Sequence, residues 1–202
     1  MSNRASWYRQ LMAAAACSTL LGVAAQAATF AALGDLPGNR PRRSWSPQDV
    51  SADGRVVVGW PLSGADSPFR WTPESGAQPI GGLARPAASR ATGVSDDGNV
   101  IVGYETDTPR AFLWTAASGA VYLPALAPDG VGAKAWGVSA DGRTVVGSVD
   151  NQPAAWIDGQ LQMLALPPTG FTIGAAWEAS DDGRVIVGGG FNGVRWVDGV
   201  AE

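Results

Sequence analysis

The sequence predicts an all-β fold, a β-propeller of about four four-stranded blades. A ten-residue phrase recurs four times, and a tryptophan follows each copy. The phrase reads VSADGRVVVG at 50–59, VSDDGNVIVG at 94–103, VSADGRTVVG at 138–147 and ASDDGRVIVG at 179–188. Its serines are spaced 44, 44 and 41 residues apart, and a regular period of this length is typical of propellers and solenoids. No helical periodicity accompanies the repeat outside the N-terminal segment, so a propeller is favoured.

The third copy shows how one unit is built. Residues 135–139, 144–149, 154–157 and 161–166 each predict a strand, because each is a short apolar run between turn residues. The turns contain Asp-Gly and Asp-Asn pairs, which adopt the positive φ angles of tight hairpins. A connection rich in Pro and Gly follows at 167–174. Four antiparallel strands in one period make one propeller blade.

The repeats are expected at about 44–87, 88–131, 132–174 and 175–202. The last copy ends after its third predicted strand, whereas residues 28–38 read as a fourth strand with no unit before it. We therefore expect the N-terminal strand to complete the last blade and close the ring, which removes an open sheet edge. The alternatives are a larger ring that a second chain completes, and a fragment of a longer protein.

The N-terminal segment has the pattern of a secretory signal peptide. Arg4 and Arg9 precede an apolar run at 11–25, and Ala25-Gln26-Ala27 is a cleavage signal. Residues 1–27 are therefore predicted to be removed, leaving a repeat domain at 28–202. The apolar run is shorter than the roughly 20 residues of a membrane-spanning helix, so stable membrane insertion is not expected. The predicted location is the periplasm, the cell surface or the medium.

Composition excludes several classes of function. Removing Arg4 and Arg9 from the 14 basic residues leaves 12 against 18 acidic ones, which argues against nucleic acid as a general partner. Histidine is absent, and the only cysteine, Cys17, lies within the predicted signal. The usual general base, zinc ligand and redox group are therefore missing. The acidic pairs at 96–97 and 181–182 lack the spacing of a calcium loop, so neither metal nor cofactor is expected.

Several motifs resemble those of a known family, the bacterial secreted proteins called "extracellular repeat, HAF family". They are AFLW at 111–114, LGDLPG at 33–38 and SRATGVSDDGNVIVG at 89–103. The likeness covers essentially the whole predicted mature chain. Arg110 stands where the histidine of that family precedes the Ala-Phe pair, and the third and fourth copies lose the phenylalanine. The resemblance implies an exported repeat protein, sometimes the passenger of an autotransporter, and no established activity.

The serines, aspartates and glycines of the phrase are expected to be structural. The Ser-x-Asp-Gly turn loosely resembles the Asp-box of sialidases and other propellers. In either motif the Ser and Asp side chains bond to nearby backbone N–H groups and hold the hairpin. The residues concerned are Ser51, Asp53, Gly54, Ser95, Asp97, Gly98, Ser139, Asp141, Gly142, Ser180, Asp182 and Gly183.

The repeated tryptophans are expected between the blades. In three copies an apolar residue stands two positions before the tryptophan, so both side chains point to one face of the sheet. This predicts an inter-blade core that contains Trp71, Trp114, Trp156 and Trp196. Trp45 and Trp60 have no counterpart in every copy and are the better candidates for exposed contacts with a sugar.

Charge is predicted to differ between the two ends of the blades. The first turns are acidic, whereas the connections between blades carry many of the basic residues. One hypothesis is a connection face that attracts an anionic glycan or an acidic protein, through Arg42, Arg43, Arg85, Arg90 and Lys134. The alternative is that these loops are merely polar and solvated.

Together these observations predict an exported, non-catalytic binding or scaffold module, for glycan or protein partners. No catalytic residue is assigned. The alternative is a secreted glycoside hydrolase, since a pair of carboxylates can assemble from distant loops. Glu74, Glu105 and Glu178 occupy unlike positions in their repeats, and only Tyr104 and Tyr122 remain after signal removal, so the sequence does not favour an enzyme.

Overall fold

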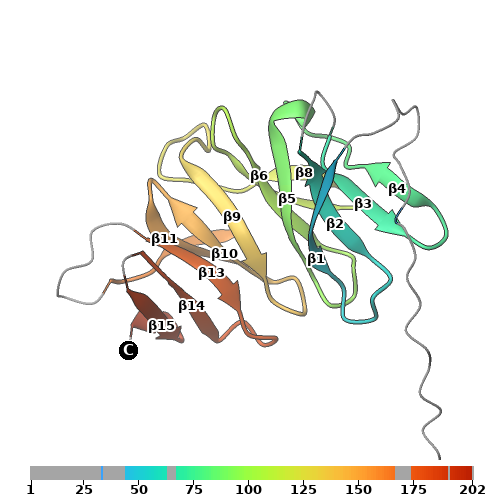
Figure 1. Cartoon of the computed structure of the whole chain (residues 1–202). Helices are drawn as coiled ribbons and strands as arrows, with labels where there is room; N and C mark the ends of the chain where they lie inside the picture. The colour runs from blue at the N-terminus through green and yellow to red at the C-terminus, as the bar shows by residue number, and fades with distance from the viewer. Residues whose placement is uncertain (1–32, 34–43, 63–66, 167–173, 191, 202) are drawn as a thin grey trace, which may run out of the picture. The chain divides into compact units, whose positions relative to one another are not determined.

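Four antiparallel sheets follow one another along the chain (Figure 1). The computed structural model describes residues 33, 44–62, 67–166, 174–190 and 192–201, all within one compact unit, Leu33–Glu202. Within the described part the only helical element is a 3-10 turn, η1 (Pro86–Ala88). Each sheet has four strands in chain order. The prediction of an all-β propeller with four-stranded blades is confirmed.

The strands have the following bounds. The first sheet contains β1 (Trp45–Val50), β2 (Val57–Pro61), β3 (Phe69–Thr72) and β4 (Gly76–Pro79). The second contains β5 (Ser89–Val94), β6 (Ile101–Glu105), β7 (Ala111–Thr115) and β8 (Gly119–Tyr122). The third contains β9 (Ala133–Val138), β10 (Thr144–Val149), β11 (Gln152–Ile157) and β12 (Gln160–Met163). The fourth contains β13 (Ala175–Ala179), β14 (Val185–Gly189), β15 (Gly193–Val197) and β16 (Val200–Ala201).

A β-bulge at one repeat position explains why every copy of the phrase ends in glycine. The first strand of each sheet has one extra residue opposite the second strand, at Gln48, Thr92, Trp136 and Trp177. The bulge brings the carbonyl two residues earlier, such as that of Arg90, against the second strand. A Cβ there would clash with this carbonyl, and the position is glycine in all four copies, at Gly59, Gly103, Gly147 and Gly188.

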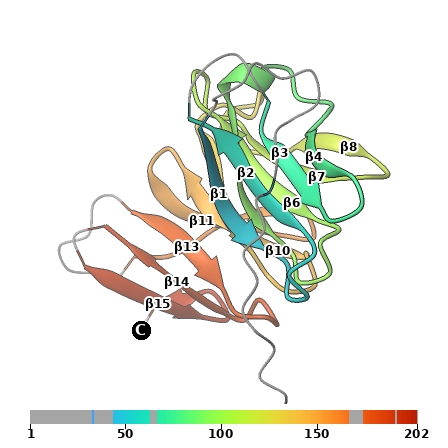
Figure 2. The same ribbon diagram turned by 45° about the vertical axis from the view of Figure 1, so that its right-hand side comes forward.

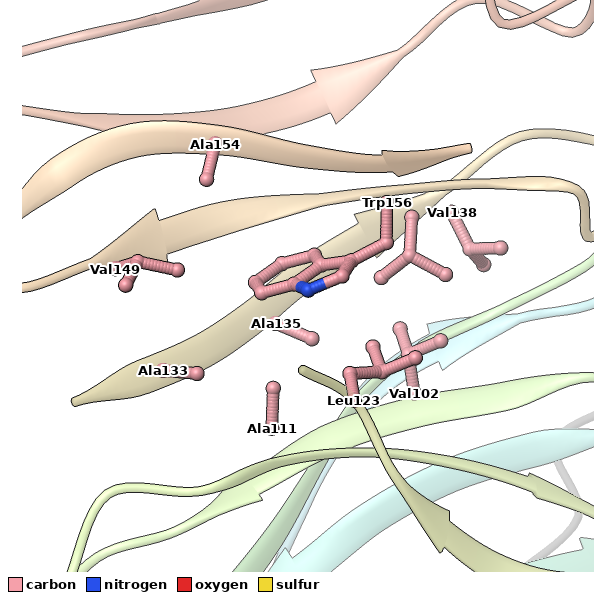
Figure 3. Packing of buried hydrophobic residues seen from close by; sticks show 10 residues of the cluster. Val102, Ala111, Leu123, Ala133, Ala135, Val138, Val149, Ala154 and Trp156 are labelled. Carbon is pink, nitrogen blue, oxygen red and sulfur yellow. The ribbon is translucent and has the colours of Figure 1, made fainter. Parts of the chain in front are cut away.

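Consecutive sheets pack through apolar side chains on their facing surfaces. Between the second and third sheets, Val102 and Leu123 meet Ala135, Val145 and Trp156, and Figure 3 shows the Trp156 ring lying among these small and branched side chains. Corresponding clusters join the first sheet to the second and the third to the fourth. Burial of this apolar surface is the main stabilising contribution, since the repeat domain contains no cysteine.

The outer surfaces of the first and last sheets remain open in the described part of the chain. Val187 of β14 is 45% exposed, whereas its counterpart Val146 in the third sheet is 0% exposed. Val50 of β1 is likewise exposed, whereas its counterpart Val94 is buried. The successive sheets are coloured from blue to red in Figure 2. Among the described strands, each sheet makes its extensive contacts only with the sheets that come before and after it in the sequence.

The predicted closing strand at 28–38 lies outside the described residues, apart from Leu33. The fourth position of the last sheet is instead taken by β16, in which Val200 pairs with Val197 and Ala201 with Trp196. The sequence predicts that this copy ends after its third strand. The structure differs because the Asp198-Gly199 turn reverses the chain within two residues, which lets the next two pair.

The predicted signal peptide at 1–27 lies outside the described residues. Among the residues that the structure describes, no helix combines the length and the apolar character that crossing a membrane requires.

Candidate ligand-binding face

The four predicted turns share one hydrogen-bond pattern. In each, the Ser Oγ donates to the Asp Oδ1 at 2.6–2.7 Å and accepts the backbone N–H five residues after the serine at 2.9–3.0 Å. The same Asp Oδ1 accepts the N–H two residues later. These bonds hold the pKa of Asp53, Asp97, Asp141 and Asp182 below its ordinary value, because they favour the charged carboxylate. Each turn is therefore stabilised by hydrogen bonds among its own residues.

The turns also couple neighbouring sheets. The backbone N–H of Ala52 donates to the carbonyl of Asp96, and the N–H of Asp96 donates to that of Ala140, each at 3.1 Å. The turn glycine has a positive φ in all four copies. In Gly98, a Cβ would also clash with Val56 of the preceding sheet, and Gly142 and Gly183 are crowded in the same way. The positive φ favours glycine in all four turns, and in the last three the neighbouring side chain also leaves no room for a Cβ.

The end of the blades that carries these turns, here called the turn face, has its arginines paired. Arg143 binds Asp158 through two hydrogen bonds of 2.8 and 2.9 Å, and Arg184 binds Asp198 in the same way. Arg55 pairs with Glu74. These arginines lower the pKa of Asp158 and Asp198. Each pair joins the first turn of a sheet to its third turn, so these cations are already engaged.

The opposite end, here called the connection face, has its cations placed differently. Arg85 donates from Nη1 to Thr108 Oγ1 at 2.7 Å. The guanidinium of Arg90 lies 5.1 Å from the Trp60 ring centroid, and the Lys134 ammonium lies 5.8 Å from that of Tyr104. None of these three cations forms a salt bridge with a described residue. Of the five predicted ligand-face residues, Arg42 and Arg43 lie outside the described part of the chain.

Aromatic rings form a row at this end of the blades, in which Tyr104 is buried, Trp60 and Trp136 are partly exposed and Trp177 is exposed. The Tyr104 and Trp136 centroids are 4.9 Å apart, and those of Trp136 and Trp177 are 5.4 Å apart. Trp177 is 50% exposed. The indole Nε1 of Trp136 is buried and has no hydrogen-bond partner among the described residues. With Trp60 beneath Arg90, the row extends over the first strands or second strands of all four sheets. We call these four rings, with Arg90 and Lys134, the aromatic–cation row.

Three hollows open on the connection face, and each is lined by one predicted cation. Arg90 lines a hollow of about 230 Å³ with Trp60 and Thr106. Lys134 lines another of about 230 Å³ with Trp136 and Trp177. Arg85 lines the largest of the three, about 270 Å³. The structure thus brings the described members of the predicted ligand face to one end of the blades, each beside a separate hollow.

The four repeated tryptophans do not share one environment. Trp156 and Trp196 are fully buried, and their indole N–H groups donate to the carbonyls of Pro124 and Ala165 in the preceding connection, at 2.7 and 2.6 Å. Trp71 is only partly buried, and so is Trp114.

The difference between the two pairs follows from volume. In the first two sheets, Phe69 and Phe112 stand two residues earlier and fill the buried position. The third and fourth sheets have only Ala154 and Val194 there, so the indole takes the space.

Trp45 is partly exposed, as Trp60 is. Its ring packs edge-on against Phe69 with centroids 5.4 Å apart. Its Nε1 is buried. Trp60 is partly exposed, and the Arg90 guanidinium lies over its ring.

Sequence reasoning missed a polar cluster beside Arg85. Glu105 is only 1% exposed, and its Oε1 accepts the Tyr122 hydroxyl at 2.5 Å and the Arg85 backbone N–H at 3.1 Å. Burial and the bond to Glu105 raise the pKa of Tyr122. The Arg110 guanidinium lies 4.0 Å from the Tyr122 ring centroid. The available signal was that Glu105 occupies a repeat position which is apolar or small in the other copies, Pro61, Val149 and Gly190.

Metal binding finds no support in the described residues, since no three acidic, His or Cys side chains among them are grouped to hold an ion.

No family model matches the sequence, and no curated protein matches it. TolB from Acinetobacter baumannii superposes with a TM-score of 0.55 at 14% identity, over 78% of this chain and 42% of that one. A protein assigned to TolB from Agrobacterium tumefaciens gives 0.56 at 18% identity, over 78% and 60%. U3-55K gives 0.50 at 17% identity, over 80% and 53%. The chain thus spans about half the length of these structures, and the likeness shows the β-propeller fold alone.

Proposed function

We propose that this protein is an exported, non-catalytic propeller that binds an acidic glycan on its connection face. The observation that carries the proposal is the aromatic–cation row, in which Arg90 and Lys134 lie over aromatic rings and form no salt bridge with a described residue. Exposed indole rings offer flat apolar faces to sugar rings. The neighbouring cations would meet the carboxylates or sulfates of an acidic polymer.

The contrast with the turn face supports the choice of face. There, arginines such as Arg143 are bound bidentately to acids of their own sheet, so an incoming anion would have to displace an internal partner. On the connection face, no acid among the described residues has to be displaced from Arg90 or Lys134. Side-chain entropy is partly lost already where a cation rests on a ring, which lowers the cost of ordering it on binding.

Export is part of the proposal and rests on the sequence. The charged, apolar and small-residue pattern at 1–27 supports it, as does the resemblance to secreted HAF repeats. The fold is compatible with a binding or scaffold role, which many propellers serve without chemistry of their own.

Tryptophan fluorescence tests the proposed function. The purified protein is titrated with oligogalacturonate and, in parallel, with a neutral oligosaccharide of similar length. We expect quenching by the acidic oligomer that weakens with salt, because charge contributes to binding. Trp177→Ala and Lys134→Gln should weaken it, whereas Arg143→Gln on the turn face serves as a matched control and should not. Binding that the control weakens equally, or no binding at all, would overturn the proposal.

A further inference from the structure

The largest of the three hollows is lined by groups that the aromatic–cation row does not include. Two basic residues, Arg85 and Arg110, line it together with the acidic residues Glu105 and Asp129. Thr108 adds a hydroxyl. The hollow measures about 270 Å³, slightly below the roughly 300 Å³ at which pockets for drug-sized molecules begin, so its size suits one small unit.

Arg110 is the lining residue whose hydrogen-bonding capacity is not satisfied by the described residues. Its Nε is buried and has no hydrogen-bond partner among the described residues. It forms no salt bridge with a described residue, and its guanidinium lies 4.0 Å from the Tyr122 ring centroid. A buried N–H left unpaired is costly, and a guanidinium presents Nε–H and Nη–H as a fork that fits two oxygens of one anion. The geometry therefore favours an oxyanion at this place.

The backbone around Arg110 holds the side chain in position. The Arg110 carbonyl accepts the Glu105 N–H at 3.0 Å, which closes the hairpin between β6 and β7. The preceding carbonyl, of Pro109, accepts the N–H groups of Gly132 and Ala133 at 2.8 and 3.2 Å. The arginine thus stands on a hairpin bonded to the next sheet, and a site built on such a frame is already ordered before a ligand arrives.

The buried carboxylate of Glu105 forms no salt bridge with either arginine of the hollow. Glu105 Oε1 is occupied by the Tyr122 hydroxyl and the Arg85 backbone N–H, and Glu105 makes no salt bridge with a described cation. The Tyr122 oxygen in turn accepts the Ala84 N–H at 2.8 Å. This network explains why Glu105 is buried, since it fastens the connection before β5 to the second sheet. Neither guanidinium is paired with an acid among the described residues, so each can pair with an external anion.

The acids of the hollow select the kind of anion. Asp129 accepts the Val131 N–H at 3.1 Å through Oδ1 and also lines the hollow. A simple anion bound to the arginines would meet this carboxylate with no donor to offer. A ligand with hydroxyl groups beside its carboxylate satisfies both, because the carboxylate faces Arg110 and Arg85 while a hydroxyl donates to Asp129.

We propose that this hollow binds a single uronic-acid unit, with its carboxylate on Arg110 and Arg85 and a hydroxyl on Asp129. The inference rests on the proposed function in one respect, the choice of a sugar acid, and it adds a subsite for one residue of the glycan. It assigns a binding role to Arg110, the residue that replaces the histidine of the family the repeats resemble.

Calorimetry with monosaccharides tests the subsite. The full-length protein is titrated with galacturonate, with galactose, and with inorganic phosphate. We expect galacturonate to bind and the other two not to bind. Arg110→Gln should weaken galacturonate binding by about tenfold or more, the scale expected for losing a charge-assisted hydrogen bond, while Arg143→Gln leaves it unchanged. An unchanged melting temperature in Arg110→Gln would show that the fold is intact.

Three outcomes would overturn the subsite. Galactose binding as well as galacturonate would deny the role of the carboxylate, and phosphate binding as well would reduce the hollow to a general anion site. Unchanged galacturonate binding in Arg110→Gln would place the sugar elsewhere. If the monosaccharide fails to bind but oligogalacturonate still quenches fluorescence through Trp177, this inference fails while the proposed function stands. If only the monosaccharide binds, the reverse holds.

Discussion

The two ends of the blades use the same residue type in opposite ways. On the turn face, Arg143 and Arg184 are each bound by two hydrogen bonds to an acid of the same sheet. On the connection face, Arg90 rests on an aromatic ring and Arg110 on a tyrosine, and neither forms a salt bridge with a described residue. The arginines of the turn face therefore hold strands together through salt bridges. Arg90 and Arg110 of the connection face have no acidic partner among the described residues.

The repeat itself shows the same division. The turn residues keep their identity, since Ser, Asp and Gly return in every copy. Residues of the connection face change from copy to copy: the position of Trp60 holds Tyr104, Ser148 and Gly189 in the other sheets. A position whose task is to hold the fold needs the same side chain each time, whereas the position of Trp60 on the connection face is not restricted in this way.

The largest expected effect comes from the tryptophans of the two regions. Trp156→Ala removes a fully buried ring and its bond to Pro124, and should lower the free energy of unfolding by about 3–5 kcal/mol. Trp177→Ala, in the aromatic–cation row, should change it by no more than about 0.5 kcal/mol because that ring is half exposed. Urea denaturation of both variants measures the difference. Equal losses would show that the row belongs to the core.

The next effect compares a covered blade surface with the open one. Val146→Ala should cost about 2 kcal/mol or more, because Val146 is fully buried between the third and fourth sheets. Its counterpart Val187, on the open surface of the last sheet, should tolerate the same change within about 0.5 kcal/mol. Thermal unfolding of the two variants gives the comparison. A large loss for Val187→Ala would mean that this surface is covered in solution.

A smaller loss is expected within the turn face. Ser139→Ala removes a buried hydroxyl that donates to Asp141 and accepts from the Thr144 N–H, leaving that N–H unpaired. The free energy of unfolding should fall by about 1–2 kcal/mol. Ser180→Ala removes the same bonds in a more exposed turn, where water replaces them, so its effect should be smaller. The reverse order, measured by denaturation, would contradict this account of the turns.

The smallest effect per site is a dependence on acid. The folded protein holds the pKa of Asp53, Asp97, Asp141 and Asp182 below its unfolded value, so these groups stabilise the fold above the ordinary aspartate pKa of about 3.9. That stabilisation is lost as the pH falls through this value toward the lower folded pKa. Melting temperatures should therefore fall with acidification in this range. Asp141→Asn should make the fall shallower, and an unchanged slope would contradict the prediction.

The fold was largely predictable because its signals are local. The turn bonds join residues two to five positions apart, so the spacing of Ser, Asp and Gly already contains them. Whether each repeated tryptophan is fully or only partly buried could not be predicted in this way. Phe112 and Trp114 point to the same side of their strand, and which ring is buried depends on the space that the neighbouring sheet leaves.

The candidate site was predictable only in part. The cations at Arg85, Arg90 and Lys134 could be placed on one face from strand order alone. The hollow beside Arg85 combines Glu105 and Arg110, from either side of the turn between β6 and β7, with Asp129 from the connection after β8. Such a combination depends on how this turn and this connection fold against each other. Repeat spacing does not encode this, because these residues belong to single copies of the repeat.

The backbone hydrogen bonds between the turns of neighbouring sheets indicate which blade is expected to unfold first. They run from Ala52 to Asp96 and from Asp96 to Ala140, and among the described residues no such bond continues to Asp181 of the last sheet. In a linear array each unit is stabilised mainly by its neighbours. Among the described strands, the last blade contacts one neighbour and lacks such a tether, so we expect fraying to start at that blade.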